Sequence, residues 1–363
     1  MSASDGLEGV VAAETVLSDV DGQAGRLIIR GHSLDEIAGR WSYEQVTALL
    51  WNGFFDELPG DMRAALGKAR VEVAGEVSAL DRELSQRTPV EAMRALTARL
   101  ADGDDLATAL RLVAAPAVFT AAAVRASKGE TPVQPDASLS HAADILRMLR
   151  GEPVPEAEAA ALDTYLVTVC DHGLNASTFA ARVVASTLAG LTSAVLAGIS
   201  ALKGPLHGGA PGPVIEMLDA IGGSQNARPW LEAALDRGDR LMGFGHRVYR
   251  VRDPRADALK KAVRALMAAS DAPPGRLELA EAVEKAALEV LRERKPGRSL
   301  DTNVELYTAL LLEALHFPPG AFTGVFAMGR SAGWVAHARE QVLGGRLIRP
   351  ASVYVGPTPR VAA

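Results

Sequence analysis

Three stretches rich in glycine, proline or polar residues each carry one histidine. They are "CDHGLNASTFAAR" (170–182), "KGPLHGGAPGPVIEML" (203–218) and "MGFGHRVYRVRDPRADALKK" (242–261). Loops held on a rigid frame often carry catalytic groups, and glycine lets a ligand approach the backbone closely. His172, His207 and His246 are therefore candidate site residues.

The surroundings of the first two histidines differ. His172 precedes a predicted helix that opens with Asn175, so it is either a solvated residue beside a helix cap or a site residue. His207 lies between Gly204 and Gly208, just ahead of another predicted helix. The positive end of a helix disfavours imidazolium, and a neutral imidazole can donate a hydrogen bond to a carbonyl group. The glycine content around His207 favours function over a purely structural loop.

His246 is followed within ten residues by four arginines: Arg247, Arg250, Arg252 and Arg255. Guanidinium groups pair with carboxylates and phosphates in a bidentate manner. The alternative is a solvated basic loop, but the neighbouring glycines and the histidine argue against it. The stretch therefore predicts a binding site for an anionic ligand.

A three-histidine zinc site and a nucleic-acid site are the competing interpretations. None of the histidine spacings is a local ligand pair such as HxxxH, and nearby arginines would repel a cation. A nucleic-acid site would need interleaved aromatic residues and an overall basic chain. We expect neither a metal nor a nucleic-acid partner.

A single carboxylate opens the apolar stretch "LDTNVELYTALLLEAL" (300–315). Glu305 has no Lys or Arg three or four residues away to pair with along a helix. One interpretation is a capping box, in which Thr302 caps the helix and Glu305 reaches back to it. The other is a catalytic base. Neutral histidines, arginines and one carboxylate together suit proton abstraction next to a carbonyl group of an anionic substrate.

Composition limits the class of protein. The chain has 363 residues, 48% of them hydrophobic, which predicts one large domain or two unequal ones. The net charge of −6 gives no general attraction to nucleic acid or to anionic membranes. Cys170 is the only cysteine and the N-terminus lacks a signal-peptide pattern, so we expect a cytoplasmic location.

The elements that would hold these residues are mainly α-helical. "RLIIR" (26–30) is a strand candidate, and Ser33 and Ser42 can cap the first two helices. The uncharged stretch 183–202 is long enough to cross a membrane, but its small residues favour a helix buried in the protein or against a second copy. We expect no membrane partner. Other helices are predicted at about 61–73, 90–103, 104–127, 137–150, 155–170, 259–270 and 277–295.

Six stretches in order resemble the citrate synthase family over nearly the whole chain. They are "DHGLNASTFAAR" (171–182), "GPLHGGA" (204–210), "GFGHRVYRVRDPR" (243–255), "NVELY" (303–307), "FAMGRSAGWVAHAREQ" (326–341) and "GRLIRP" (345–350). The resemblance implies a mainly α-helical homodimer with an active site between two domains. We expect a large domain of residues 1-208 plus 318-363 and a small domain of residues 209-317.

The resemblance also implies a reaction and its catalytic residues. Acetyl-CoA and oxaloacetate condense, and citryl-CoA is then hydrolysed, with no metal and no cofactor beyond the CoA substrate. Glu305 matches the base, His207 the donor that stabilises the enol, and His246 the group that activates the ketone. A place in the tricarboxylic acid cycle follows from this activity.

Further residues match the family's binding groups. His172, His246, Arg255 and Arg330 match residues that hold oxaloacetate. Arg349 matches an arginine that the partner subunit contributes to the same ligand. Arg250 is similar in position to a contact with the CoA phosphates.

Two positions depart from the family pattern. "NVE" replaces "NVD", so Glu305 extends one methylene further than the usual aspartate, and Gly173 stands where many members have an acid. Three functions therefore remain open: a citrate synthase, a 2-methylcitrate synthase that uses propionyl-CoA, and a catalytically weak homologue that binds CoA or a dicarboxylate.

Overall fold

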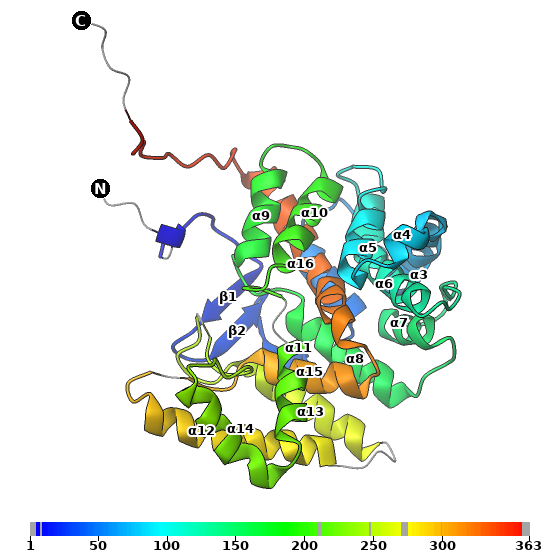
Figure 1. Ribbon diagram of the computed structural model, residues 1–363. Coiled ribbons are helices and arrows are strands. Elements are labelled where there is room, and N and C mark those ends of the chain that lie inside the picture. Colours follow the sequence, from blue (N-terminus) through cyan, green and yellow to red (C-terminus); the bar gives the residue numbers. More distant parts are fainter. Residues whose placement is uncertain are drawn as a thin grey trace, which may run out of the picture.

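The computed structural model of the protein describes residues 5–7, 9–208, 212–246, 248–269, 275–298 and 300–357. Helices dominate it, which confirms the expected mainly α fold class (Figure 1). The helices of the first half are α1 (Leu34–Ile37), α2 (Tyr43–Trp51), α3 (Met62–Val73), α4 (Arg82–Ser85), α5 (Pro89–Thr97), α6 (Leu106–Ser127), α7 (His141–Arg150) and α8 (Glu156–Val169). Those that follow are α9 (Ala176–Ala185), α10 (Leu191–Leu202), α11 (Gly212–Ile221), α12 (Ala227–Asp236), α13 (Pro254–Ala268), α14 (Gly275–Arg294), α15 (Val304–Ala314) and α16 (Phe322–Gly344).

Side-chain caps define where many helices begin. Ser42 accepts a hydrogen bond from Gln45 N, and Ser33 forms a capping box with Glu36, as the sequence predicted. Asn175 accepts from the backbone of the first turn of α9, and Asn303 does the same for α15. Because these caps fix the start of a helix, they also fix which loop residues lie just before it.

The prediction of one continuous helix over 183–202 is wrong. The segment contains the end of α9 and all of α10, which lie side by side (Figure 1). Leu188 and Gly190 separate the helices with positive φ angles of 63° and 94°, a conformation that ends a right-handed helix.

A small antiparallel sheet lies near the N-terminus. Its strands are β1 (Ser18–Asp21), β2 (Arg26–Ile29) and β3 (His32–Ser33), in the order β1-β2-β3. β2 is the predicted strand, whereas β1 and β3 were not predicted. The turn before β2 contacts a loop far along the chain: Gly22 O accepts a hydrogen bond from Arg250 N at 2.8 Å, and a Cβ on Gly22 would meet Val248 O at 2.2 Å. The sheet therefore holds the loop that follows His246.

Helix α16 runs through the buried core, where it packs against α2, α6, α8, α9 and α10. Its glycines allow this close packing. A Cβ on Gly333 would lie 2.2 Å from Cys170 O, and one on Gly329 would lie 2.5 Å from Val169 Cγ2. The residues after α8 therefore approach the face of α16 that carries Arg330 and His337.

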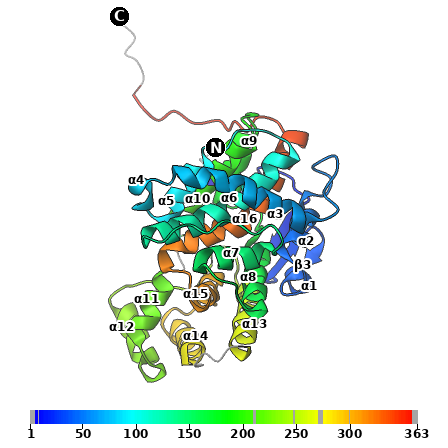
Figure 2. The same ribbon diagram turned by 90° about the vertical axis from the view of Figure 1, so that its right-hand side faces the viewer.

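Helices α11 to α15 gather at one end of the molecule, below the other helices in Figures 1 and 2. α13 packs against both α8 and α15 and so connects this group to the rest. The division into residues 1-208 plus 318-363 and 209-317 stays a prediction, because residues 209–211 lie outside the described residues.

Among the described helices, α6 is long and apolar enough to cross a membrane, but 83% of its apolar stretch is buried inside the protein. α15 and the segment Pro319–Gly344 pass the same test only as a pair bent by 120°. Packing of α6 against α3, α5 and α16 accounts for its composition.

Candidate active site

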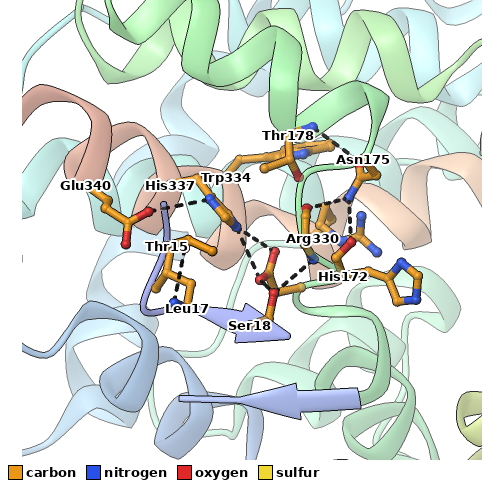
Figure 3. Close-up of polar contacts among 12 residues, drawn as sticks. Thr15, Leu17, Ser18, His172, Asn175, Thr178, Arg330, Trp334, His337 and Glu340 are labelled. Carbon is orange, nitrogen blue, oxygen red and sulfur yellow. Dashed lines mark hydrogen bonds and ion pairs between the residues drawn. The ribbon is translucent and has the colours of Figure 1, made fainter. Parts of the chain in front are cut away.

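The loop between α8 and α9 presents His172. The preceding Asp171 is fully buried and accepts hydrogen bonds from Ser18 Oγ at 2.5 Å and from the His337 ring at 3.1 Å (Figure 3). Burial would raise the pKa of Asp171, but His337 and Ser18 lower it, so the carboxylate stays charged. The His172 ring points away from His337 and Ser18, and its Nε2 lies 3.1 Å from Tyr249 Oη.

His246 is held by the backbone that follows it. Its Nδ1 accepts hydrogen bonds from Val248 N at 3.0 Å and Tyr249 N at 3.1 Å, so the neutral ring carries its proton on Nε2. Burial, with a further contribution from Arg255, lowers the pKa of His246 to about 4. Arg255 Nη2 lies 3.2 Å from the same Nε2. Two donors face each other here, and one acceptor oxygen could satisfy both.

Arg255 lies in the first turn of α13 and is 3% exposed. Asp253, the N-cap residue, holds its guanidinium with two hydrogen bonds of 3.0 and 2.8 Å. Burial opposes the charge, but Asp253 outweighs it and raises the pKa of Arg255 above its ordinary value. The site therefore contains a permanent positive charge beside the neutral His246.

Arg330 supplies a second buried cation from α16. Its Nε donates to Val169 O at 2.6 Å, and its guanidinium carbon lies 4.9 Å from the centre of the Phe326 ring. Burial lowers the pKa of Arg330 to about 10, which leaves it charged at neutral pH. Within the described ranges, Nη1 and Nη2 of Arg330 have no hydrogen-bond partner, so they can donate hydrogen bonds to a carboxylate.

His207 lies in the loop after α10. Its Nε2 is 2.8 Å from Ser177 Oγ, which also accepts from Trp334 Nε1 at 3.2 Å. The Ser177 hydroxyl proton can go to His207 Nε2 or to Asn175 Oδ1. In the first case, the neutral His207 ring has a proton on Nδ1 that it can donate. Burial, with help from Arg330 and Arg255, lowers the pKa of His207 to about 4.

Glu305 does not form the predicted capping box with Thr302. Asn303 is the N-cap residue, and its Oδ1 accepts from Glu305 N at 3.1 Å. Thr302 Oγ1 instead donates to Glu284. Glu305 Oε2 is buried and has no hydrogen-bond partner among the residues that the structure describes. Burial raises the pKa of Glu305, although Arg255 opposes the shift, and these are properties of a base rather than of a cap.

The structure brings most of the predicted residues together. His172 contacts His246 edge to face with ring centres 5.7 Å apart, and both rings contact Tyr249. Burial lowers the pKa values of His172 and His207, and the charges of Arg255 and Arg330 lower both further. Arg255, on α13, also lowers the pKa of Glu305, against the larger effect of burial.

Two predicted binding residues lie apart from this group. Arg349 is exposed, in the segment after α16 that extends away from the body of the protein (Figure 1). Arg250 is exposed in the loop beside Gly22. Arg349 makes no contact with the histidines among the described residues, and Arg247 lies outside them.

Sequence reasoning missed several residues that shape the site. Tyr249, only 1% exposed, lies between two of the histidines, and Ser177 orients His207. Asp253 holds Arg255 in place. An aromatic or a small polar residue near a histidine is not by itself a signal, because these contacts connect loops that are far apart in the sequence.

The described residues hold no cluster of three or more His, Cys, Asp and Glu side chains arranged for a metal. The residues gathered at the site are neutral imidazoles, the buried guanidinium groups of Arg255 and Arg330, and Glu305, a carboxylate with a raised pKa. This combination can bind a small anion bearing carboxylates, polarise a carbonyl group and remove a proton from an adjacent carbon.

Comparison with known proteins places this site in context. The model "Citrate synthase, C-terminal domain" matches residues 6–351. The citrate synthase of Haloferax volcanii is 41% identical, over 97% of this chain and 95% of that protein. The 2-methylcitrate synthase of Mycobacterium tuberculosis is 37% identical, over 98% of this chain and 91% of that protein.

A solved structure extends the similarity to three dimensions. The citrate synthase of Thermoplasma acidophilum, in a ternary complex with carboxymethyl coenzyme A and oxaloacetate, has a TM-score of 0.84. The similarity covers 100% of this chain and 98% of that one, at 28% sequence identity.

Proposed function

The chain belongs to the citrate synthase family of Claisen-type condensing transferases, and from this premise we propose that it condenses acetyl-CoA with oxaloacetate and water to give citrate and CoA. The observation that carries the proposal is the buried Oε2 of Glu305, a carboxylate oxygen without a partner among the described residues, held in the field of Arg255. A base must be free to accept a proton, and Glu305 is the site carboxylate that has this property.

The proposed reaction begins with oxaloacetate. Arg255 and Arg330 bind its carboxylates, and His172 supports its position. His246 Nε2 donates a hydrogen bond to the ketone oxygen. Arg255 Nη2 and His246 Nε2, two donors that face each other in the structure, then share this oxygen as an acceptor. The ketone carbon becomes more electrophilic as a result.

Glu305 then removes a methyl proton from acetyl-CoA, and the C–H electron pair forms the enol carbon–carbon double bond. His207 hydrogen-bonds to the thioester oxygen and stabilises the enol. The enol carbon attacks the ketone carbon to form the new C–C bond, and the carbonyl electron pair moves to the ketone oxygen, which takes up the Nε2 proton of His246. Glu305 then releases its proton to water and His246 takes one up from water, so both groups return to their starting states. Water finally hydrolyses the thioester of citryl-CoA, which releases CoA thiol and citrate. The chain's own side chains carry these steps, and we propose no metal or additional cofactor.

We propose a homodimer for the complete site. Arg349 is exposed on an extended segment, where it can reach a second subunit and bind that subunit's oxaloacetate. Arg250, exposed next to the site loop, is proposed to contact the CoA phosphates. We propose that the enzyme is cytoplasmic and acts in the tricarboxylic acid cycle.

A second candidate function is 2-methylcitrate synthesis from propionyl-CoA. It is favoured by the 37% identity to a 2-methylcitrate synthase, close to the 41% for a citrate synthase. The two acyl groups differ by one methyl group, worth about 1–3 kcal/mol of discrimination in an apolar pocket.

The first test measures release of free CoA thiol with oxaloacetate and either acetyl-CoA or propionyl-CoA. We expect turnover by the natural protein and a loss of about 10²–10⁴-fold in kcat for Glu305→Gln, the usual contribution of a general base. A higher kcat/KM for propionyl-CoA would make the second candidate correct. Binding of both substrates without turnover would contradict both and favour a catalytically weak homologue.

A further inference from the structure

Glu284 on α14 is a buried carboxylate that, among the described residues, contacts neither the site histidines nor Arg255 and Arg330. It is 5% exposed, and a charged side chain is rarely so buried unless it is paired. Four donors surround it. Its Oε1 accepts from Arg252 Nη1 at 2.7 Å and from Thr302 Oγ1 at 2.8 Å. Its Oε2 accepts from Lys260 Nζ at 2.8 Å and from Tyr307 Oη at 2.6 Å.

These donors come from separate parts of the site. Arg252 lies in the loop between His246 and Arg255, and Lys260 follows Arg255 along α13. Thr302 and Tyr307 lie on either side of Glu305, which precedes Tyr307 on α15 by two residues. Burial would raise the pKa of Glu284, but the bonds from Lys260, Tyr307 and Arg252 lower it to about 2, so it is charged throughout the neutral range.

The backbone next to Thr302 makes the same connection. Gly245 N donates to Asp301 O at 2.7 Å, and Asn303 N donates to Gly243 O at 3.0 Å. Asn303 Nδ2 donates to Gly245 O at 2.9 Å. Residues 301–303 therefore pair with the residues immediately before His246, so a shift of one segment moves the other.

Tyr307 also controls the rotation of α15. Successive residues of an α-helix are about 100° apart, so Glu305 and Tyr307 project on nearly opposite sides. A bond from Tyr307 to Glu284 on one side, with Thr302 bound to the same carboxylate just before the helix, fixes both the rotation and the axial position of its first turn. Glu305 itself has little to hold it, since its Oε2 lacks a partner in the described part of the chain.

We propose that Glu284 is a positioning residue for the condensation: it joins the loop of His246 and Arg255 to the first turn of α15 and so sets where the Glu305 carboxylate meets the substrate. The inference rests on the proposed role of Glu305 as the base. Glu305 is longer than the aspartate expected from the family pattern, so its reach depends on the position of the helix that carries it.

The test compares Glu284→Gln, Thr302→Val and Tyr307→Phe with Glu313→Gln. Glu313 lies on α15, the helix that carries Glu305, but near its other end. It accepts two hydrogen bonds of 2.8 Å from Arg276. Thr302→Ser keeps the hydroxyl and serves as the conservative variant. A base displaced by about 1 Å can cost on the order of 10²-fold in rate, so we expect Glu284→Gln to lower kcat by about 10–100-fold.

Three readouts separate positioning from general stability. The KM for acetyl-CoA should change little, and the isotope effect with acetyl-CoA deuterated at the methyl group should increase because proton removal becomes slower. Thr302→Ser should restore most of the kcat lost in Thr302→Val. Glu313→Gln should leave kcat and the isotope effect near those of the natural protein. A kcat for Glu284→Gln equal to that of Glu313→Gln would overturn the proposal.

Hydrogen exchange separates this proposal from the proposed function. Peptides covering 243–246 and 300–308 should exchange faster in Glu284→Gln than in Glu313→Gln, whether or not the protein turns over. If Glu305→Gln retains full activity, the assigned base is wrong, and faster exchange would still support the structural connection. If exchange in both peptides is unchanged, Glu284 does not hold these segments and the positioning role is wrong.

Discussion

The proposed oxaloacetate side of the site and the proposed proton-transfer side are built differently. On the first, His246 Nδ1 accepts two backbone hydrogen bonds, and Arg255 is fixed by Asp253. On the second, the Glu305 carboxylate has a buried oxygen with no partner among the described residues. The proposed binding groups are held by direct bonds, whereas the proposed base is held by the helix to which it is attached. Strong bonds would stabilise the charged form of Glu305 and weaken it as a base.

This comparison predicts that damage to the binding side appears mainly in KM. Arg330→Lys loses the planar fork that can hold a carboxylate in a bidentate manner, so we expect the KM for oxaloacetate to rise by about 10²-fold. Steady-state kinetics at saturating acetyl-CoA would measure the change.

Helix α16 offers a matched control for that variant. Arg339 also donates through Nε to a backbone carbonyl, Phe54 O at 3.1 Å, and also lies over a phenylalanine ring, that of Phe55. Arg339→Lys should leave the KM for oxaloacetate near its natural value. Equal effects of the two substitutions would mean that Arg330 only supports packing.

Damage to the proton-transfer side should instead appear in kcat. Glu305→Asp keeps the carboxylate but withdraws it by one methylene, about 1 Å or more, so we expect kcat to fall by about 10–100-fold with a small change in either KM. Turnover assays with both acyl-CoA substrates would measure it. An increase in kcat would show that the helix is placed for the shorter side chain and that glutamate detunes the enzyme.

The smallest predicted effect concerns stability. Because the pKa of Glu305 is raised in the folded protein, folding favours its protonated form. Its contribution to stability is therefore complete below the ordinary pKa of 4.5 and is lost as pH rises through the folded value. Glu305→Gln should raise the melting temperature at neutral pH, and the gain should disappear in mild acid. Thermal unfolding from pH 4 to 8 would measure this. A lower melting temperature at pH 7 would contradict the idea of an unpaired carboxylate.

The decrease of kcat at low pH should also depend on Glu305. A base must be deprotonated, so kcat should fall as pH drops through the raised pKa of Glu305, above 4.5. His207 and His246, with pKa values of about 4, should already be neutral there. If kcat instead falls because a histidine with an ordinary pKa becomes protonated, the inference that the site histidines are neutral is wrong.

Sequence patterns predicted the helical fold and many helix starts because these depend on local periodicity and capping, as at Ser42. The same local reasoning failed where two options were equally compatible with the pattern. Thr302 and Asn303 are both good caps, but Asn303 caps the helix and Thr302 donates to the distant Glu284. The break near Leu188 was missed because the apolar composition continues across it.

The sequence pointed to the histidines and arginines of the candidate site, but not to the contacts that orient them. Motifs around His246 and Arg255 are contiguous, so the resemblance could place them together. Ser177 and Tyr249 were missed because their roles depend on side chains 30 and 77 residues away, His207 and His172. Arg349 stays a prediction, since its proposed ligand belongs to another subunit.

The N-terminal hairpin has a consequence for the order in which the protein is made. Gly22 leaves the ribosome long before Arg250 and Val248, the residues it packs against. At about 5–20 residues per second, the delay is on the order of ten to fifty seconds. Its strands of four, four and two residues are too short to be stable alone. This early segment therefore completes its folding late, when the loop that follows His246 has been made and can pack against it.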